Sequence, residues 1–232
     1  MPSLLPHAES VVLGGVSYTP QEVIDVLGPL LTDERRARIA EVVAGRTCTV
    51  VPVVECLYDR GNVSAVVRSA EALGYQCLHN IDTSEKYRHA GRVTQGAEKW
   101  VDMAVWQSTG ACLDHLREKG YRILATHFED AQPLSAFDFT RPTALVFGNE
   151  KDGVSGAVLE AAEARVVLPM AGFVRSFNIS VAAALCLYHV QQDRIRRQGF
   201  HGDLTPSERE RLVAEFHLRS LNYGDRILGQ LR

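Results

Sequence analysis

The sequence predicts an α/β protein with a mostly parallel sheet and helices on both faces of that sheet. Short apolar and β-branched runs, such as residues 49–54 and 143–147, alternate with helical segments along much of the chain. Strands that are separated by helices need crossover connections, which place neighbouring strands parallel and cover both sheet faces. The 232 residues are 46% hydrophobic and 23% charged, which is typical of a globular chain that buries a sizeable core.

Apolar periodicity and the residues that start or stop helices give the expected elements. Strands are expected at 49–54, 77–81, 103–106, 122–126, 143–147 and 165–168. Helices are expected at 17–46 (broken at Gly28-Pro29 and restarted at the N-cap Thr32), 63–73, 111–119, 154–164, 179–198 and 205–218. Residues 82–100 are expected to form a long polar loop, and residues 222–232 to be loosely attached.

This pattern divides the chain into three parts. Residues 1–47 are expected to be a helical extension, residues 48–192 an α/β domain, and residues 193–232 a second, Arg-rich helical extension. The formal net charge is −3, but it is unevenly spread: residues 194–232 hold 8 Arg and 5 acidic residues, and the rest holds 17 basic and 23 acidic ones. A basic end favours a polyanionic partner, although salt-bridged helix faces explain it as well.

Several classes of protein are disfavoured. The five cysteines are odd in number and lack C-x-x-C spacing, which argues against a disulfide framework or a zinc site and favours a reducing compartment. No apolar run reaches the roughly 18 residues of a membrane helix. We therefore expect no membrane or metal partner, and a cytoplasmic protein, or an organellar one if a transit peptide was removed. The G-x-G-x-x-G, Walker A, H-E-x-x-H and G-x-S-x-G motifs are all absent.

Three polar clusters follow expected strands, where open α/β sheets bind their ligands. The first cluster consists of residues 59–62 with Arg68. In the alternative interpretation, Asn62 is a helix cap and Arg68 is a surface charge. The second, residues 147–153, has two glycines and two acids, which suit a ligand-binding loop or a plain turn equally. The third, residues 168–178, runs from a strand into a helix that Ser176 or Asn178 could cap.

Taken together and in this order, the clusters resemble the motifs of the SpoU/TrmH family of SPOUT RNA methyltransferases. Residues 62–68 (NVSAVVR) are similar to its N-x-x-A-x-x-R motif, and residues 147–155 (FGNEKDGVS) to its F-G-x-E-x-x-G-x-S motif. Residues 168–172 (LPMAG) and 176–180 (SFNIS) are similar to its third motif. The likeness extends to residues 33–39 and to the G-x-x-K-W segment at 96–100.

The resemblance implies a deep trefoil knot in the C-terminal part of the sheet domain, an exception to the rule that chains are not knotted. The knot would bind S-adenosylmethionine largely through backbone groups, and the protein would work as a homodimer. By position, the implied cofactor contacts are Thr126, Gly148, Leu168, Met170, Ser176 and Phe177.

The resemblance also implies the catalytic residues: Arg68 at the centre, supported by Asn62, Glu150, Ser176 and Asn178. The family assigns this arginine as the base or as the group that binds the target phosphate. A guanidinium with a pKa above about 12 is a poor base, so its proton role is left open. The chain departs from the family pattern at Arg175, where a neutral amide is usual, and at Phe177, which replaces a usual Leu.

The expected activity is ribose 2′-O-methylation of tRNA, at a D-loop guanosine (position 18). Ribosomal RNA as the substrate, a non-catalytic RNA-binding relative, and a small-molecule α/β enzyme are the alternatives. The arginines expected to contact RNA are Arg35, Arg36, Arg38, Arg60, Arg175, Arg194, Arg196 and Arg197.

Overall fold

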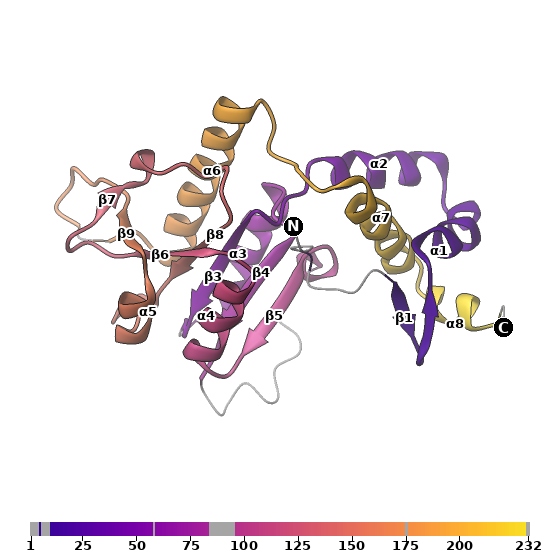
Figure 1. Cartoon of the computed structure of the whole chain (residues 1–232), viewed down its shortest axis with the longest axis horizontal. Helices are drawn as coiled ribbons and strands as arrows, with labels where there is room; N and C mark the ends of the chain where they lie inside the picture. The colour runs from indigo at the N-terminus through magenta and orange to yellow at the C-terminus, as the bar shows by residue number, and fades with distance from the viewer. Residues whose placement is uncertain (1–4, 6–9, 58, 84–95, 175, 231–232) are drawn as a thin grey trace. The chain divides into compact units, whose positions relative to one another are not determined.

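A computed structural model describes residues 5, 10–57, 59–83, 96–174 and 176–230 of the chain (Figure 1). Contacts divide the chain into two compact units. We call Met1–Thr47 with Gly202–Arg232 the end unit, because it joins both ends of the sequence, and Cys48–His201 the sheet unit. The expected boundary at 192/193 differs from this division, because it falls inside a long helix of the sheet unit.

The end unit is a small helical assembly with a hairpin. Its elements are β1 (Val11–Leu13), β2 (Val16–Tyr18), α1 (Pro20–Leu27), η1 (Gly28–Leu30), α2 (Asp33–Ala44), α7 (Pro206–Ser220) and α8 (Gly224–Gly229). Thr19 with Glu22 and Thr205 with Glu208 form capping boxes that start α1 and α7, and Thr32 caps α2 as predicted.

One apolar cluster holds the end unit together. Side chains of the hairpin, α1, α7 and α8 meet there, with Val23 and Leu27 of α1 fully buried against Ala214 of α7. Leu228 of α8 is 1% exposed, and its carbonyl accepts a hydrogen bond from the Tyr18 hydroxyl at 3.2 Å. The expectation that 222–232 is loosely attached is therefore wrong for α8, because Leu228 is buried in the apolar cluster and Ile227 packs against it.

The sheet unit contains a seven-stranded sheet in which every described strand pair is parallel. The strands are β3 (Val50–Glu55), β4 (Cys77–Ile81), β5 (Asp102–Trp106), β6 (Arg122–Thr126), β7 (Gln132–Pro133), β8 (Thr143–Phe147) and β9 (Ala164–Val167), in the spatial order 5-4-3-8-6-9-7. The helices are α3 (Arg60–Ala72), α4 (Thr109–Glu118), α5 (Gly156–Ala161) and α6 (Ile179–Gln198), with the short η3 (Ala97–Lys99) and η4 (Leu134–Ala136).

Helices cover both faces of this sheet, as predicted. The helices α3 and α6 pack against each other on one face, and α4 and α5 pack together on the other (Figure 1). Strands β3 and β8 lie at the centre and are buried at every residue, which explains their continuous apolar sequence. Strand β5 lies at an edge and is only partly buried.

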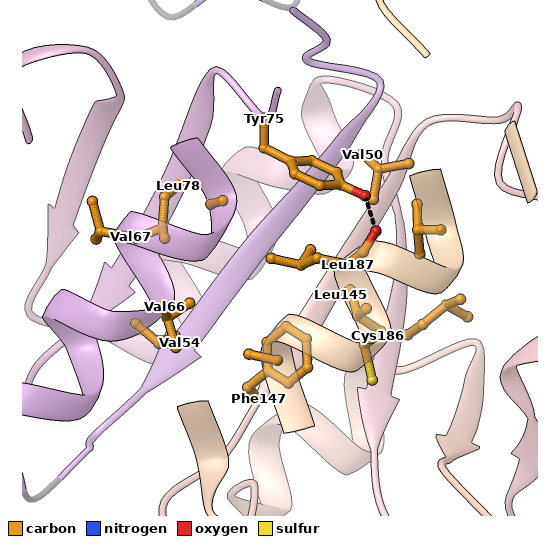
Figure 2. Close-up of a cluster of buried hydrophobic side chains, with 14 of the residues drawn as sticks. Val50, Val54, Val66, Val67, Tyr75, Leu78, Leu145, Phe147, Cys186 and Leu187 are labelled. Carbon is orange, nitrogen blue, oxygen red and sulfur yellow. Dashed lines mark hydrogen bonds between the residues drawn. The ribbon is translucent and has the colours of Figure 1, made fainter. Parts of the chain in front are cut away.

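The main core lies between the sheet and the α3–α6 pair (Figure 2). Tyr75 is completely buried there and donates a hydrogen bond of 2.7 Å to the carbonyl of Leu187 in the middle of α6. Burial raises the pKa of Tyr75 well above its ordinary value, so the hydroxyl keeps its proton and remains a donor. The Tyr75 hydroxyl therefore ties the middle of α6 to the sheet unit's core.

Candidate active site

The three polar motifs meet at the carboxyl edge of the sheet. The chain leaves β3 toward β4 on one side, and leaves β8 toward β9 on the other, so a topological switch point lies between β3 and β8. Residues of the first motif follow β3, those of the second follow β8, and those of the third follow β9. Ligands of open α/β sheets bind at such a point.

A chain of side-chain hydrogen bonds joins the three motifs. The amide nitrogen of Asn62 donates to Oε1 of Glu150 in a short contact, and the amide nitrogen of Asn178 donates to Oδ1 of Asn62 at 3.4 Å. These residues are 88 and 116 positions apart in sequence, respectively. Glu150 and Asn178 are exposed and Asn62 is partly exposed, so the chain of amides and carboxylate is open to a substrate.

The structure decides between capping and functional roles for the two asparagines. Asp59, and not Asn62, caps α3: its carboxylate accepts from the backbone N–H of Gly61 at 2.7 Å. The capping interpretation of Asn62 is therefore wrong, and its amide is committed to the other motifs. Asn178 does both, because its side-chain oxygen accepts from Ser180 N at 2.9 Å and caps α6 while its nitrogen faces Asn62.

A buried carboxylate outside the three motifs supports the second motif. Glu55, at the end of β3, is 2% exposed. Its two oxygens accept hydrogen bonds from the Ser155 N–H at 2.8 Å, the Ser155 hydroxyl at 2.7 Å and the Thr109 hydroxyl at 2.7 Å. Glu55 thus ties the end of the motif loop and the first turn of α4 to the central strand. An acidic residue inside an otherwise apolar run was the available signal.

The two glycines of the second motif are explained by the turn itself. A Cβ at Gly148 would lie 2.0 Å from the carbonyl carbon of Gly153 and 2.1 Å from the nitrogen of Val154. Asn149 and Gly153 exchange two backbone hydrogen bonds of 3.1 Å, and Gly153 has a φ of +70°. Because Gly148 has no Cβ, the backbone of residues 153 and 154 can approach it and the loop can close. Any contact of Gly148 with a cofactor is made by its backbone.

The third motif begins as an extended loop. Residues 168–174 lie in neither helix nor strand, so their backbone groups are not used in a ladder. Leu168 packs against the main core, Met170 is partly exposed, and Phe177 is 40% exposed at the far end of the motif. Nearby, the Thr126 hydroxyl at the end of β6 donates to the Val146 carbonyl at 3.0 Å. Arg175 lies outside the described residues.

Comparison with known proteins agrees with this geometry. The family model described as the SpoU rRNA methylase family matches residues 49–188. The chain belongs to the SpoU rRNA methylase family. A tRNA (guanosine(18)-2′-O)-methyltransferase of Escherichia coli K12 is 34% identical over 186 residues, covering 78% of this chain and 81% of the relative. A Borreliella burgdorferi relative of the same name is 33% identical over 84% of this chain and 89% of the relative.

Solved structures give the same family. The crystal structure of a TrmH/SpoU tRNA modifying enzyme of A. aeolicus superimposes with a TM-score of 0.73, at 28% identity, over 82% of this chain and 98% of the other. The SpoU methyltransferase AviRb of Streptomyces viridochromogenes, solved in complex with AdoMet, gives a TM-score of 0.55 at 26% identity, over 66% and 62% of the two chains. The mostly parallel α/β sheet of this SpoU methylase is thus the fold of the family.

Two predicted catalytic residues of this SpoU methylase stand apart from the hydrogen-bonded chain. Arg68 is exposed on α3, six residues after Asn62 and therefore about 9 Å farther along the helix axis. Within the described residues its guanidinium makes no hydrogen bond or ion pair. Ser176 is exposed in the loop that precedes the α6 cap. Both side chains are free to meet a ligand.

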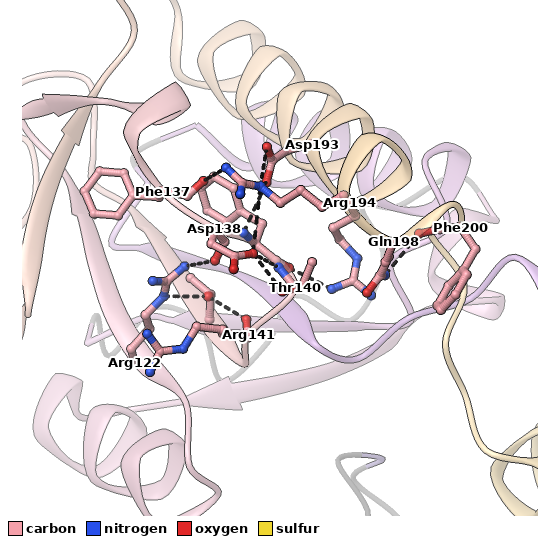
Figure 3. A network of polar contacts seen from close by, with 12 residues as sticks. Arg122, Phe137, Asp138, Thr140, Arg141, Asp193, Arg194, Gln198 and Phe200 are labelled. Carbon is pink, nitrogen blue, oxygen red and sulfur yellow. Dashed lines mark hydrogen bonds and ion pairs between the residues drawn. The ribbon is translucent and has the colours of Figure 1, made fainter.

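The predicted RNA-contacting arginines differ in what they offer. Arg194 is completely buried and donates to the carbonyls of Phe139 at 2.7 Å and His201 at 3.1 Å (Figure 3). Its prediction as an RNA contact is wrong, because the end of α6 packs on the 137–141 segment instead of extending into solvent. Arg197 makes two hydrogen bonds to the buried Asp193, at 2.9 and 2.8 Å.

In the end unit, Arg36 is also used internally. It donates to the carbonyls of Gly28 and Leu31 and forms an ion pair with Asp33, which fixes η1 to the start of α2. Arg38 pairs with Glu41 at 2.7 Å on an exposed surface, where such a pair is easily exchanged. Among the predicted arginines that the structure describes, the exposed ones are Arg35, Arg38, Arg60, Arg196 and Arg197.

Neither a membrane-spanning helix nor a metal cluster is present among the described residues. Of the helices in this part of the chain, none has the length and apolar character needed to cross a membrane. No group of three or more described His, Cys, Asp or Glu side chains is arranged to hold a metal ion.

Proposed function

We propose that this SpoU methylase transfers a methyl group from S-adenosylmethionine to the ribose 2′-oxygen of guanosine 18 in tRNA. The observation that carries the proposal is the meeting of Asn62, Glu150 and Asn178 at the switch point of the sheet. Relatives named for this reaction align with this chain over about four fifths of its length. The superposition on the A. aeolicus tRNA modifying enzyme covers 98% of that chain and 82% of this one, which supports a tRNA substrate.

The residues at the carboxyl edge fit the proposed cofactor. The 168–174 loop offers backbone groups that no helix or strand uses, and Leu168, Met170 and Phe177 offer apolar surface for an adenine ring. Thr126 and the backbone of Gly148 lie at the ends of the adjacent strands β6 and β8. The bound cofactor would supply an electrophilic methyl group on a sulfonium.

The remaining side chains would orient the ribose. The carboxylate of Glu150 and the amides of Asn62 and Asn178 can hold a hydroxyl in one direction, which lowers the barrier by positioning. Arg68 would bind a phosphate next to the target nucleotide, a role that needs no change of its charge state. Arg35, Arg38, Arg60 and Arg196 would add salt-dependent contacts to the RNA backbone.

The proposal includes a homodimer and the C-terminal trefoil knot of the family. One face of α6 exposes Val181, Leu185, Tyr188 and Ile195, whose spacing of four, three and seven residues forms a single stripe. This stripe lies opposite the buried face of α6, and apolar stripes of this length mark interaction surfaces. In the dimer, we expect the stripe to pack against a second copy.

A tRNA substrate also implies a cytoplasmic or organellar location.

Methylation of tRNA with labelled S-adenosylmethionine tests the activity. Unfractionated tRNA should accept one methyl group, mapped to the 2′-oxygen of guanosine 18. A transcript in which guanosine 18 is replaced should accept none. Labelling of ribosomal RNA alone, or of another tRNA position, would contradict the proposed substrate.

Arg68→Ala tests the proposed site. We expect methyl transfer to fall at least about 100-fold while the affinity for S-adenosylmethionine stays within about twofold, because Arg68 serves the RNA and not the cofactor. Arg68→Lys keeps the charge without the planar fork and should recover only part of the rate. A near-normal rate in Arg68→Ala would refute the assignment.

A further inference from the structure

A second cluster of charged side chains lies at the amino edge of the sheet, away from the candidate active site. A pocket of about 350 Å³ opens there beside the starts of β6 and β8. Its lining includes three arginines, Arg117, Arg122 and Arg141, and one acidic residue, Glu163. Because β6 and β8 are each five residues long, roughly 16 Å of strand separates this edge from the carboxyl edge.

Arg122 is held rigidly in this pocket by neutral groups. Its Nε donates to the Thr143 hydroxyl at 2.8 Å, and an Nη donates to the carbonyl of Asp138 (Figure 3). The guanidinium also lies over the rings of Phe137 and Phe139, at 5.9 and 5.8 Å. Burial and the positive charge of Arg141 lower the pKa of Arg122, and the carboxylates of Asp138 and Glu163 act in the opposite direction without reversing the shift. A fixed arginine is a preorganised donor, because little side-chain freedom remains to be lost on binding.

The other two arginines add charge that the described residues do not neutralise by ion pairing. Arg117 donates to the carbonyl of Ala161 at 2.6 Å, and the Arg141 guanidinium has no hydrogen bond or ion pair within the described chain. The position of the Arg117 side chain is explained by the carbonyl groups at the nearby helix ends, because helix C-termini attract cations. That explanation does not extend to Arg122 and Arg141, which lie at strand starts. The lining carries three guanidiniums and one carboxylate, and the Asp138 carboxylate next to Arg122 offsets only part of this positive charge.

We propose that this pocket binds a phosphate group through the guanidiniums of Arg117, Arg122 and Arg141. Planar guanidiniums match the oxygens of a phosphate with paired hydrogen bonds, and an anion would relieve the repulsion between Arg122 and Arg141. The phosphate could belong to the RNA backbone or to a free phosphate compound. The proposal stands on the pocket itself and does not depend on the proposed methyl transfer.

The test compares variants of the full-length protein in inorganic phosphate and in chloride at equal ionic strength. Arg141→Ala should weaken phosphate binding about tenfold or more, the size expected for one charge-assisted hydrogen-bonding group. Arg141→Lys should bind with intermediate affinity. Lys119→Ala is the matched control, because Lys119 is an exposed cation at the end of α4 outside the pocket lining, and it should bind like the wild type. Arg141 is exposed, so its replacement should leave the fold intact.

A salt titration of tRNA affinity identifies the source of the phosphate. If an RNA phosphate occupies the pocket, Arg141→Ala should reduce the slope of log K against log salt by about 0.7 to 0.9, whereas Lys119→Ala should not. Loss of phosphate binding with an unchanged slope assigns the pocket to a free phosphate compound. The proposal is overturned if neither phosphate binding nor the tRNA slope depends on Arg141. A wild type that binds phosphate here but methylates no tRNA would refute only the proposed function.

Discussion

Glu55 is a single residue on which the shape of the active-site edge depends. Its carboxylate is almost fully buried, and three donors from the loop after β8 and from α4 converge on it. A buried carboxylate is stable only when its oxygens are satisfied, and the donors are equally costly to leave without a partner. Glu55 acts on the site through Ser155 and Thr109, so it is a positioning residue.

Replacing Glu55 should therefore damage both stability and turnover. Glu55→Ala removes the shared acceptor of three donors, which belong to the half-buried Thr109 and the exposed Ser155, and we expect the free energy of unfolding to fall by about 2 kcal/mol. Glu55→Gln keeps one acceptor oxygen and should lose less. At a temperature where both variants are folded, kcat should fall more than KM rises, because the Glu150 loop is displaced while the RNA surface is kept. Urea unfolding and steady-state methylation measure the two effects.

The control for this experiment is Glu160→Ala. Glu160 is an exposed carboxylate on α5, and among the described residues it makes no hydrogen bond or ion pair. It should unfold and methylate like the wild type. Equal behaviour of Glu55→Ala and Glu160→Ala would contradict the positioning role.

His79 makes the stability of the sheet unit depend on pH. Burial, and then the nearby His115, lower the pKa of His79 to about 4. Its Nδ1 accepts a hydrogen bond from the Trp106 indole at 3.0 Å, which requires a neutral ring. The unfolded chain, with a histidine pKa near 6.5, binds the proton more readily than the folded one. The contribution of the neutral His79 ring to the free energy of unfolding is therefore fully present above about pH 6.5 and is lost as the pH falls toward 4.

The expected loss from this one group is about 2 kcal/mol of unfolding free energy at pH 5, relative to pH 8. Urea unfolding at both pH values measures it, and His79→Phe should remove this part of the pH dependence. An NMR titration in which the His79 ring gains its proton near pH 6.5 would show that the buried indole contact does not hold it neutral.

At the scale of elements, the central strands follow directly from the sequence and the short elements do not. Strands 77–81, 122–126 and 143–147 and helix 179–198 lie where they were expected. Strand 143–147 is buried at every residue, and such burial demands a continuous apolar run. The β1–β2 hairpin and β7 were not predicted, because three- and two-residue strands carry too few residues for a pattern. Residues 17 and 18, expected to be helical, belong to β2.

The site was predictable in composition but not in its contacts. The order of the motifs identified Asn62, Glu150 and Asn178, yet their contact depends on β3 and β8 being neighbours, which no local pattern specifies. Glu55 was missed because an acid at the end of a strand looks like the beginning of a loop. The burial of Arg194 was also missed, because a run of arginines after an apolar helix face predicts a solvent-exposed end.

At the scale of the whole molecule, the net charge of −3 says little about RNA binding. The excess of arginine after residue 193 is partly used inside the protein. Arg194 is buried, and Arg211 and Arg219 both pair with Glu215 at 2.7 Å on α7. The arginines that remain for a polyanion are therefore fewer than the arginine count suggests, and each of the two units holds some of them.

The joining of both chain ends into one unit leads to a last prediction. Ala214 of α7 is completely buried in the apolar cluster with Val23 and Leu27 of α1. Ala214→Asp places a carboxylate among these apolar side chains, and should destabilise the end unit by about 3 kcal/mol or more. Because contacts cluster within each unit, hydrogen exchange should speed up in α1 and α7 and stay slow in β3 and β8.

The matched control is Ala37→Asp, the same substitution at an exposed position of α2, which should leave exchange in α1 and α7 unchanged. If the end unit carries part of the tRNA surface through Arg35 and Arg38, Ala214→Asp should also raise the KM for tRNA while the affinity for S-adenosylmethionine is retained. Exchange that speeds up equally in β3 and β8 would mean that the two units unfold as one, because the loss of the α1–α7 contact would then have spread through the whole chain.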